Sequence, residues 1–211
     1  MNKPTMQNAL VFVGAAGSGK DTAAEAVLEV VEGARVLKFA AALKDMCARV
    51  YGWDRDKIDT NLNYKESVAR YFDGTPQIVL DGKALTRRQI LQHVGTDIFR
   101  QLNDDVWLYS ALHDVVSAET HEGPTPLWVV TDARFKNEIG FLRDKFERVR
   151  VVRVIRRGGT SGTTWFTHIS EQEGNQIDVD FEIVAEDGDV ESLQDAAVSI
   201  ALTFFDTGEA A

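Results

Sequence analysis

Five short apolar segments stand out along the chain, at 10–13, 36–39, 127–130, 149–155 and 181–185. Runs of this length without polar alternation are typical of strands that are buried on both faces of a parallel sheet. Most of them are separated by stretches in which apolar residues recur every three or four positions, which predicts amphipathic helices. This alternation predicts an α/β fold, with a doubly wound, five-stranded parallel sheet and helices on both faces.

The helix pattern is clearest after the first strand. There Ala24, Val27, Leu28 and Val31 share one helical face, and Gly33 ends the helix. Comparable spacing predicts further helices at 43–50, 108–115, 135–142 and 190–204.

Turn and cap residues mark a hairpin and the start of another helix. Asp81-Gly82 lies between two short apolar runs and predicts a tight hairpin. Thr86 and Gln89 then form a capping-box pattern, which predicts a helix that runs toward Arg100.

Two stretches, 53–75 and 156–174, lack a regular pattern and are expected to form mobile loops or small inserted elements. Neither has the composition of a boundary between domains. The chain is therefore expected to form a single domain over 1–211, in which 53–85 is an insert and 156–174 is a lid.

Composition narrows the class of protein. The net charge of −10 argues against binding to polymeric nucleic acid through a basic surface. The single cysteine, Cys47, permits no intrachain disulfide and fits a reducing compartment. We find neither an apolar run long enough to span a membrane nor a signal peptide at the N-terminus, so no membrane partner is expected. A cytoplasmic protein is the expectation.

A glycine-rich motif follows the first predicted strand. Gly14, Gly19 and Lys20 have the spacing of a phosphate-binding loop, with Gly17 and Ser18 between them. Glycines allow the backbone N–H groups to turn inward around phosphate oxygens, and the positive end of the next helix adds to the attraction. Lys20 would reach the β- and γ-phosphates. The motif predicts that the chain binds a nucleoside triphosphate.

The loop departs from the general pattern at one position. Asp21 stands where a serine or threonine usually follows the lysine, and Thr22 comes next. The usual hydroxyl contacts Mg²⁺, so one hypothesis is that the Asp21 carboxylate faces the metal, directly or through water. The alternative is that Asp21 caps the helix N-terminus.

Three further segments carry residues suited to phosphoryl transfer, which requires cations around two sets of phosphates. Arg88 and Gln92 share one helix face, where they can grip a phosphate and read a base, or can simply be solvated. Asp132 ends a buried strand, where it can orient Mg²⁺ or cap a helix, and Arg134 follows it. Arg157 precedes Gly158-Gly159, a candidate hinge for a lid, although a solvated basic turn is the alternative.

Among the four histidines, none has metal-ligand spacing with another or with Cys47, and only His168 lies in the predicted lid. Trp107 lies at the edge of an apolar stripe. It can stack on a base, although core packing is the commoner role of such a residue.

The chain resembles the bacteriophage deoxynucleoside monophosphate kinases, nearly from end to end, although the match is weak around 53–77. Five sequence blocks and a closing turn carry the resemblance, namely Gly17 to Thr22, Phe39 to Asp45, Arg88 to Asp97 with Trp107, Val130 to Arg134 with Glu138, Thr167 to Glu171, and Asp187 to Leu193.

The resemblance implies transfer of the γ-phosphoryl group of ATP to a deoxynucleoside 5′-monophosphate, with Mg²⁺. Lys20 would stabilise the migrating phosphoryl group, and Arg88 and Arg134 would hold the acceptor phosphate. Gln92 would read the base, and Arg157 would be a lid arginine. It further implies that Asp45, Trp107, Asp132, Glu138 and His168 line the acceptor site, and that the protein forms a homodimer.

Two departures from the family are visible. Ala16 and Gly17 replace a basic pair of the best-known phage member, so positive charge near the phosphates must come from elsewhere. Asp189 replaces a serine or threonine of the final turn, which affects capping only.

Other functions remain open. The chain can be a P-loop kinase of another metabolite, such as phosphomevalonate or dephospho-coenzyme A. It can also be a regulatory protein that holds or hydrolyses ATP, or a structural protein with a degenerate loop. The Arg88–Gln92 pairing argues against a regulatory protein, and intact Gly19, Lys20 and Thr22 argue against a structural protein with a degenerate loop.

Overall fold

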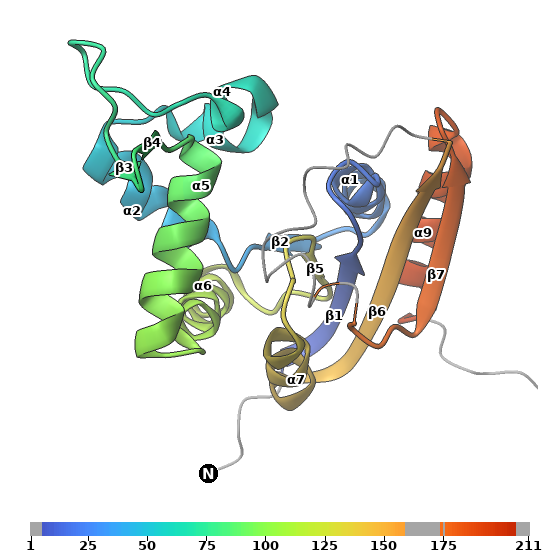
Figure 1. Ribbon diagram of the computed structural model, residues 1–211. Coiled ribbons are helices and arrows are strands. Elements are labelled where there is room, and N and C mark those ends of the chain that lie inside the picture. Colours follow the sequence, from blue (N-terminus) through green and yellow to red (C-terminus); the bar gives the residue numbers. More distant parts are fainter. Residues whose placement is uncertain (1–5, 159–173, 175, 206–211) are drawn as a thin grey trace, which may run out of the picture. The chain divides into compact units, whose positions relative to one another are not determined.

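The computed structural model describes residues 6–158, 174 and 176–205, and Figure 1 shows the chain coloured along its sequence. The chain divides into two compact units. The first unit comprises Met1–Lys38 and His113–Ala211, and the second comprises Phe39–Leu112. The predicted insert at 53–85 lies inside the second unit. Most of the predicted lid at 156–174 lies outside the described residues.

The first unit is built on a parallel sheet. Its strands lie in the order β2-β5-β1-β6-β7, which confirms the predicted five-stranded parallel arrangement. Their bounds are β1 (Met6–Val13), β2 (Arg35–Leu37), β5 (Trp128–Val130), β6 (Phe146–Arg157) and β7 (Phe181–Glu186).

The register of the sheet aligns the carboxyl ends of β2 and β5. Val11 in β1 pairs with Val130 in β5, and Val130 also pairs with Leu37 in β2. The residues that directly follow β2 and β5 therefore leave the sheet at neighbouring positions. In open α/β sheets this edge is where ligands bind.

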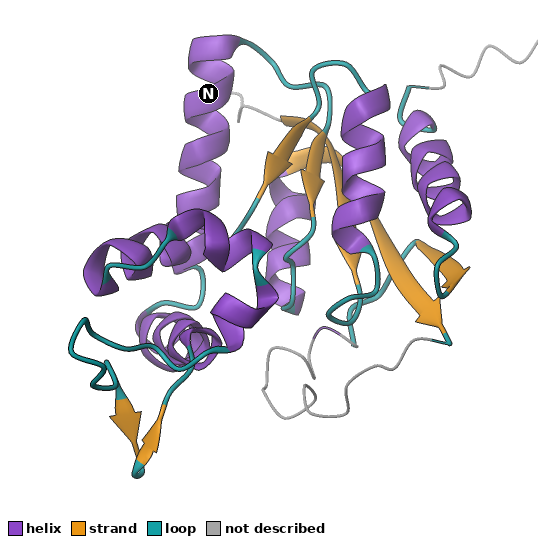
Figure 2. Ribbon diagram, turned by 90° about the horizontal axis from the view of Figure 1, so that it is seen from above, coloured by secondary structure: helices purple, strands orange, loops and turns teal. Residues whose placement is uncertain are grey.

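Helices cover both sides of this sheet (Figure 2). They are α1 (Lys20–Val30), α7 (Lys136–Lys145), α9 (Val190–Leu202) and the C-terminal part of α6 (Val106–Glu122). A core cluster joins Leu10 and Phe12 of β1 to Val27 of α1 and Ala197 of α9. Successive residues of a strand point to opposite faces, so a continuous apolar run such as β1 is what a sheet covered on both sides requires.

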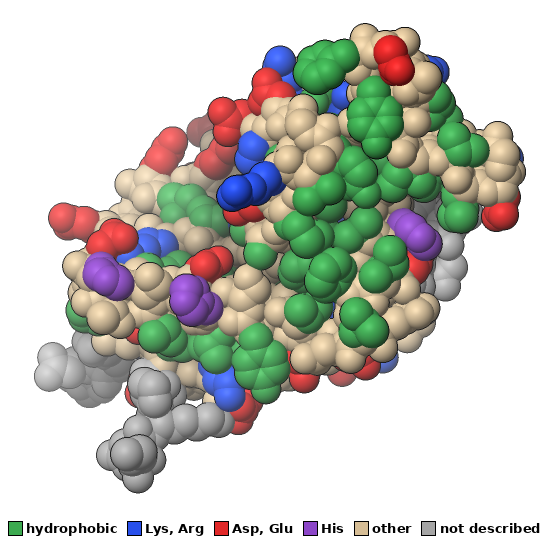
Figure 3. Space-filling model, turned by 90° about the vertical axis from the view of Figure 1, so that its left-hand side faces the viewer, with side chains coloured by type: hydrophobic (Ala, Val, Ile, Leu, Met, Phe, Trp, Pro, Cys, Tyr) green, Lys and Arg blue, Asp and Glu red, His purple; other side chains and the backbone are tan. Residues whose placement is uncertain are grey.

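The second unit has its own small core around Trp53, Ile58 and Ile90. Its elements are α2 (Ala41–Tyr51), α3 (Arg55–Thr60), α4 (Leu62–Glu66), β3 (Val79–Leu80), β4 (Lys83–Ala84), α5 (Arg87–Gln92), the π-helix η1 (His93–Arg100) and the start of α6. Large apolar side chains remain exposed on this unit, among them Phe72 and Leu102. Figure 3 shows hydrophobic side chains gathered on one face of the molecule.

Local turn chemistry behaves as the sequence predicts. Asp81 and Gly82 have φ angles of 49° and 74°, so both adopt the left-handed conformation of a tight hairpin turn. The Gln89 N–H donates to Thr86 Oγ1 at 3.2 Å, and the Thr86 N–H donates to Gln89 Oε1 at 2.9 Å, which completes the capping box. The helix that follows was expected to run regularly toward Arg100, but after Gln92 it widens into the π-helix η1.

In the part of the chain that the structure describes, no helix is both long enough and apolar enough to cross a membrane.

Candidate functional site

The glycine-rich segment forms a tight loop between β1 and α1. Gly14, Gly17 and Gly19 have φ angles of 144°, 75° and 104°. At Gly14 the backbone also passes very close to β6, because a Cβ atom there would lie 2.4 Å from the Val154 carbonyl oxygen. Only glycine satisfies both conditions, so the loop is built around this residue.

Lys20 lies across the mouth of the loop. Its Nζ donates hydrogen bonds to the carbonyl oxygens of Gly14 at 2.8 Å and Ala15 at 2.6 Å. Inside the loop the Ser18 side chain is buried, and its Oγ has no hydrogen-bond partner among the described residues. An anion placed in the loop would give this hydroxyl an acceptor, and it would meet the N-terminus of α1, where backbone N–H groups are unpaired.

Asp21, the second residue of α1, is held from two other segments. Lys38 follows β2, and its Nζ donates to Asp21 Oδ1 at 3.1 Å. Thr131 follows β5, and its Oγ1 donates to the same oxygen at 2.8 Å. The N-cap of α1 is Gly19, so the alternative in which Asp21 caps the helix is wrong.

Partial burial tends to raise the pKa of the Asp21 carboxyl, but the charge of Lys38 and the hydrogen bonds from Thr131 and Lys38 outweigh it. The pKa is therefore held below its ordinary value, and Asp21 is a carboxylate at neutral pH.

Lys38 was not identified from the sequence. The available signal was a charged residue inside the predicted apolar run at 36–39, because the observed strand β2 ends at Leu37 and leaves Lys38 directly after it. What the sequence does not supply is the register that brings the ends of β2 and β5 to the start of α1.

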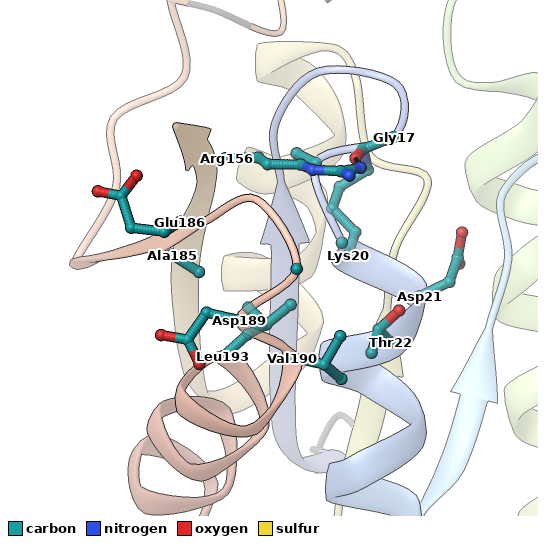
Figure 4. A pocket seen from close by; sticks show the side chains of 13 residues that line it. Gly17, Lys20, Asp21, Thr22, Arg156, Ala185, Glu186, Asp189, Val190 and Leu193 are labelled. Atoms are coloured by element: carbon teal, nitrogen blue, oxygen red, sulfur yellow. Dashed lines mark hydrogen bonds between the residues drawn. The ribbon is translucent and has the colours of Figure 1, made fainter. Parts of the chain in front are cut away.

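A pocket of about 300 Å³ adjoins the loop (Figure 4). One wall is the loop and the first turn of α1. The other is formed by Glu186 at the end of β7, Asp189 in the following turn and Leu193 in the first turn of α9. Arg156 lies in its lining, where a guanidinium N–H donates to the Gly17 carbonyl oxygen at 3.3 Å. Arg156 also pairs with Asp187.

The sequence drew attention to Arg157 in this region, whereas the structure brings its neighbour Arg156 to the loop. We expect Arg156→Ala to raise the KM for ATP roughly fivefold, because a partly exposed charge contributes about 1 kcal/mol. Arg157→Ala should lower kcat instead if that residue acts from the lid. Steady-state kinetics at varied ATP separate the two. An unchanged KM in Arg156→Ala would remove Arg156 from the ATP site.

Asp132, Arg134 and Glu138 lie between β5 and the first turn of α7. The N-cap of α7 is Phe135, so the reading of Asp132 as a helix N-cap is wrong. Glu138 is 4% exposed, and its Oε2 accepts hydrogen bonds from the backbone N–H groups of Arg134 at 2.6 Å and Phe135 at 3.0 Å. Glu138 thus fixes the position of the Arg134 backbone.

In the second unit, Arg88 and Gln92 lie one turn apart, since Gln92 ends α5. Arg88 is largely buried and pairs with Glu66 of α4. Asp45 of α2 pairs with Arg55 of α3. These ion pairs hold Arg88 and Asp45 in defined positions on the second unit.

Trp107 lies in the core of the second unit. It is 9% exposed, and its indole N–H donates to the Gly95 carbonyl oxygen at 3.0 Å. Its ring contacts Phe99 at a centroid distance of 5.3 Å. These contacts favour the packing role over stacking on a base.

A conservative replacement distinguishes the two roles of Trp107. Trp107→Phe should lower the free energy of unfolding by about 1–2 kcal/mol, because the Gly95 carbonyl loses its donor, and should leave the KM for the acceptor unchanged. Trp128→Phe is the matched control, since that buried indole donates to Glu119 at 3.1 Å in the first unit. A raised KM in Trp107→Phe alone, with stability retained, would restore the stacking role.

His168 lies outside the described residues. Within 6–158, 174 and 176–205 there is no group of three or more His, Cys, Asp or Glu side chains that could hold a metal ion by themselves. Mg²⁺ does not need such a group, because it commonly binds one or two carboxylates together with substrate phosphates and water. Asp21 and Asp132 are the two carboxylates that the sequence predicts for this role.

The family model described as deoxynucleotide monophosphate kinase matches residues 63–197, more than half of the chain. A curated relative, the putative deoxynucleotide monophosphate kinase of Acanthamoeba polyphaga mimivirus, is 29% identical over 145 residues, which are 63% of this chain and 67% of that protein.

Solved structures with a similar chain path include a sugar kinase from Janibacter sp., with a TM-score of 0.43 and 15% identity over 96% of both chains. Another is the shikimate kinase of Acinetobacter baumannii, with a TM-score of 0.42 and 13% identity over 98% of this chain and 97% of that one.

A parallel sheet with a phosphate-binding loop between β1 and α1 is the arrangement of P-loop nucleotide-binding proteins. The matched region begins after the loop, so the loop geometry and the family match are separate observations. The chain belongs to the deoxynucleotide monophosphate kinase family and is a phosphotransferase of the nucleoside monophosphate kinase type.

Proposed function

We propose that the protein transfers the γ-phosphoryl group of ATP to a deoxynucleoside 5′-monophosphate and releases ADP and a deoxynucleoside diphosphate. The observation that carries the proposal is the phosphate-binding loop with Lys20 across its mouth. The family match supports the class of acceptor.

In the donor half, the loop from Gly14 to Thr22 binds the phosphates of ATP. The backbone N–H groups and Ser18 Oγ supply neutral donors, and Lys20 supplies the charge nearest the transferred group. The pocket beside the loop accommodates the nucleoside of ATP. Phosphoryl transfer consists mainly of positioning and charge neutralisation, so these groups need no further chemistry.

Asp21 and Asp132 would hold Mg²⁺. When bound, the metal neutralises charge that develops on the phosphate oxygens. Asp21 lies at the start of α1, and Asp132 lies just after β5. Asp21 is ionised at neutral pH, because Lys38 and Thr131 hold its pKa below the ordinary value.

For the acceptor, Arg88 and Arg134 bind the phosphate and Gln92 reads the base. Asp45 and His168 are the remaining proposed contacts, Trp107 packs in the core of the second unit, and Glu138 acts through the backbone of Arg134. The acceptor is already a phosphate anion, so no strong general base is required.

The experiment is a coupled ADP-release assay with Mg-ATP against dAMP, dCMP, dGMP, dTMP and the matching ribonucleotides. Phosphomevalonate and dephospho-coenzyme A serve as competing acceptors. Turnover on one or more deoxynucleotides supports the proposal and gives the base preference. Turnover on a competing metabolite alone would assign a different kinase, and ATP binding without transfer would favour a regulatory protein.

We also propose a homodimer in the cytoplasm that supplies nucleotides to a bacteriophage, in the host cytoplasm if the gene belongs to the phage. The exposed apolar side chains of the second unit, including Phe72, Leu102 and Tyr109, support self-association. The mimivirus relative supports a viral setting. Light scattering coupled to size-exclusion chromatography tests the dimer, which a monomer at assay concentration would contradict.

A further inference from the structure

The start of α1 carries an acidic side chain directly beside the phosphate site. Asp21 follows Lys20, and the triphosphate that the loop is proposed to bind is itself strongly negative. A carboxylate so close to phosphates repels them unless a cation compensates for it. The sequence also lacks basic residues at Ala16 and Gly17, which leaves the source of the compensating charge open.

In the structure, the Lys38 ammonium group compensates for the charge of Asp21. Lys38 Nζ donates to Asp21 Oδ1 at 3.1 Å and to Thr131 Oγ1 at 2.6 Å, while Thr131 Oγ1 donates to Asp21 Oδ1 at 2.8 Å. The three side chains form a closed ring of hydrogen bonds. Each comes from a different segment of the first unit, and the Thr131 residue is 5% exposed.

The ring also orients the carboxylate. Both donors bind Oδ1, so the second oxygen, Oδ2, is left to meet a ligand or its metal. Thr131 uses its single proton toward Asp21 and accepts from Lys38, so the direction of each hydrogen bond is fixed. Few alternative positions of Asp21 satisfy all three groups.

We propose that Lys38 is the counter-charge that allows an acidic residue to occupy this phosphate-binding loop, and that with Thr131 it positions Asp21 for the metal-bound nucleotide. The inference rests on the proposed ATP site and assigns Lys38 as a positioning residue of that site. Its consequence is specific. Without Lys38, Asp21 repels a nucleotide that carries no metal, whereas Mg²⁺ restores the balance of charge.

Strand β2, which Lys38 directly follows, offers a matched control. Arg35, at the first position of β2, pairs with Glu122 at 3.1 Å, the same separation as in the Lys38–Asp21 pair. Its exposure of 27% is close to the 35% of Lys38. Arg35→Met therefore removes a comparable ion pair from β2 at the opposite end of the strand from Lys38.

The test is isothermal titration calorimetry of ATP into the full chain, with excess EDTA and with saturating Mg²⁺. We expect Lys38→Met to weaken the affinity for metal-free ATP roughly tenfold, but to weaken the affinity for ATP in the presence of Mg²⁺ less than about threefold. Its melting temperature should stay within a few degrees of the wild-type value. Lys38→Arg should restore metal-free binding, and so should the double variant Asp21→Asn with Lys38→Met, because it removes both charges. Arg35→Met should bind as the wild type does.

The inference would be overturned if Lys38→Met lost the same affinity for ATP with and without Mg²⁺. It would also be overturned if the double variant bound metal-free ATP no more tightly than Lys38→Met, since a merely structural role predicts both results. A wild-type protein that binds no ATP would overturn it as well. These readouts need no acceptor and no turnover. A protein that binds ATP in this pattern but phosphorylates no deoxynucleotide would refute the proposed function and leave the role of Lys38 intact.

Discussion

Lys20→Ala is expected to lower kcat by about a thousandfold, the largest effect of any single side chain in the site. Its ammonium group is fixed at the mouth of the loop by two carbonyl oxygens, where it meets the charge that develops on the transferred phosphoryl group. Stabilisation that is strongest in the transition state appears in kcat rather than in KM alone.

The measurement is single-turnover and steady-state phosphoryl transfer at saturating Mg-ATP. Lys83→Ala is the control, since Lys83 is an exposed lysine of the hairpin in the second unit. That variant should behave as the wild type does. A Lys20→Ala protein that retains a tenth or more of the wild-type kcat would show that the loop does not act on the transferred group.

The second large effect is expected at Gly14. An alanine Cβ would lie 2.4 Å from the Val154 carbonyl oxygen and 2.9 Å from Ser18 Oγ, and φ at this position is +144°. The carbonyl belongs to the backbone of β6 and has little freedom to move. Gly14→Ala should therefore lower the free energy of unfolding by roughly 3 kcal/mol and abolish ATP binding.

Gly17→Ala is the matched control for Gly14→Ala. Gly17 also has a positive φ, +75°, but its added Cβ would meet no described atom within 4 Å. Gly17→Ala should therefore lower the free energy of unfolding only by the cost of a positive φ at a residue with a Cβ, about 1 kcal/mol. Urea unfolding of both variants tests the comparison, and equal losses at the two positions would show that close packing against β6 is not what requires Gly14.

The strands and most helices were predictable because their signals are local. Five apolar runs match the five strands of the parallel sheet, and the hairpin at Asp81-Gly82 and the capping box at Thr86 lie where their turn residues predict. The π-helix η1 was not predictable, because a shift in backbone hydrogen bonding leaves no distinct pattern of apolar residues.

The site was predictable only in part. The loop residues carry a motif that is read from spacing alone, whereas Lys38 contributes through an ion pair that depends on the sheet register. The choice between Arg156 and Arg157 depends on which face of β6 each side chain occupies, and a one-residue difference reverses that face. Glu138 was expected in the acceptor site, and the structure shows in addition that its carboxylate accepts hydrogen bonds from the backbone N–H groups of Arg134 and Phe135.

The most direct test of the central claim is transfer of label from [γ-³²P]ATP to each deoxynucleoside 5′-monophosphate, with products separated by chromatography. The proposal predicts that label appears in a deoxynucleoside diphosphate in step with ADP, and that Lys20→Ala abolishes both. Label that appears only in inorganic phosphate, or only in another metabolite, would contradict it.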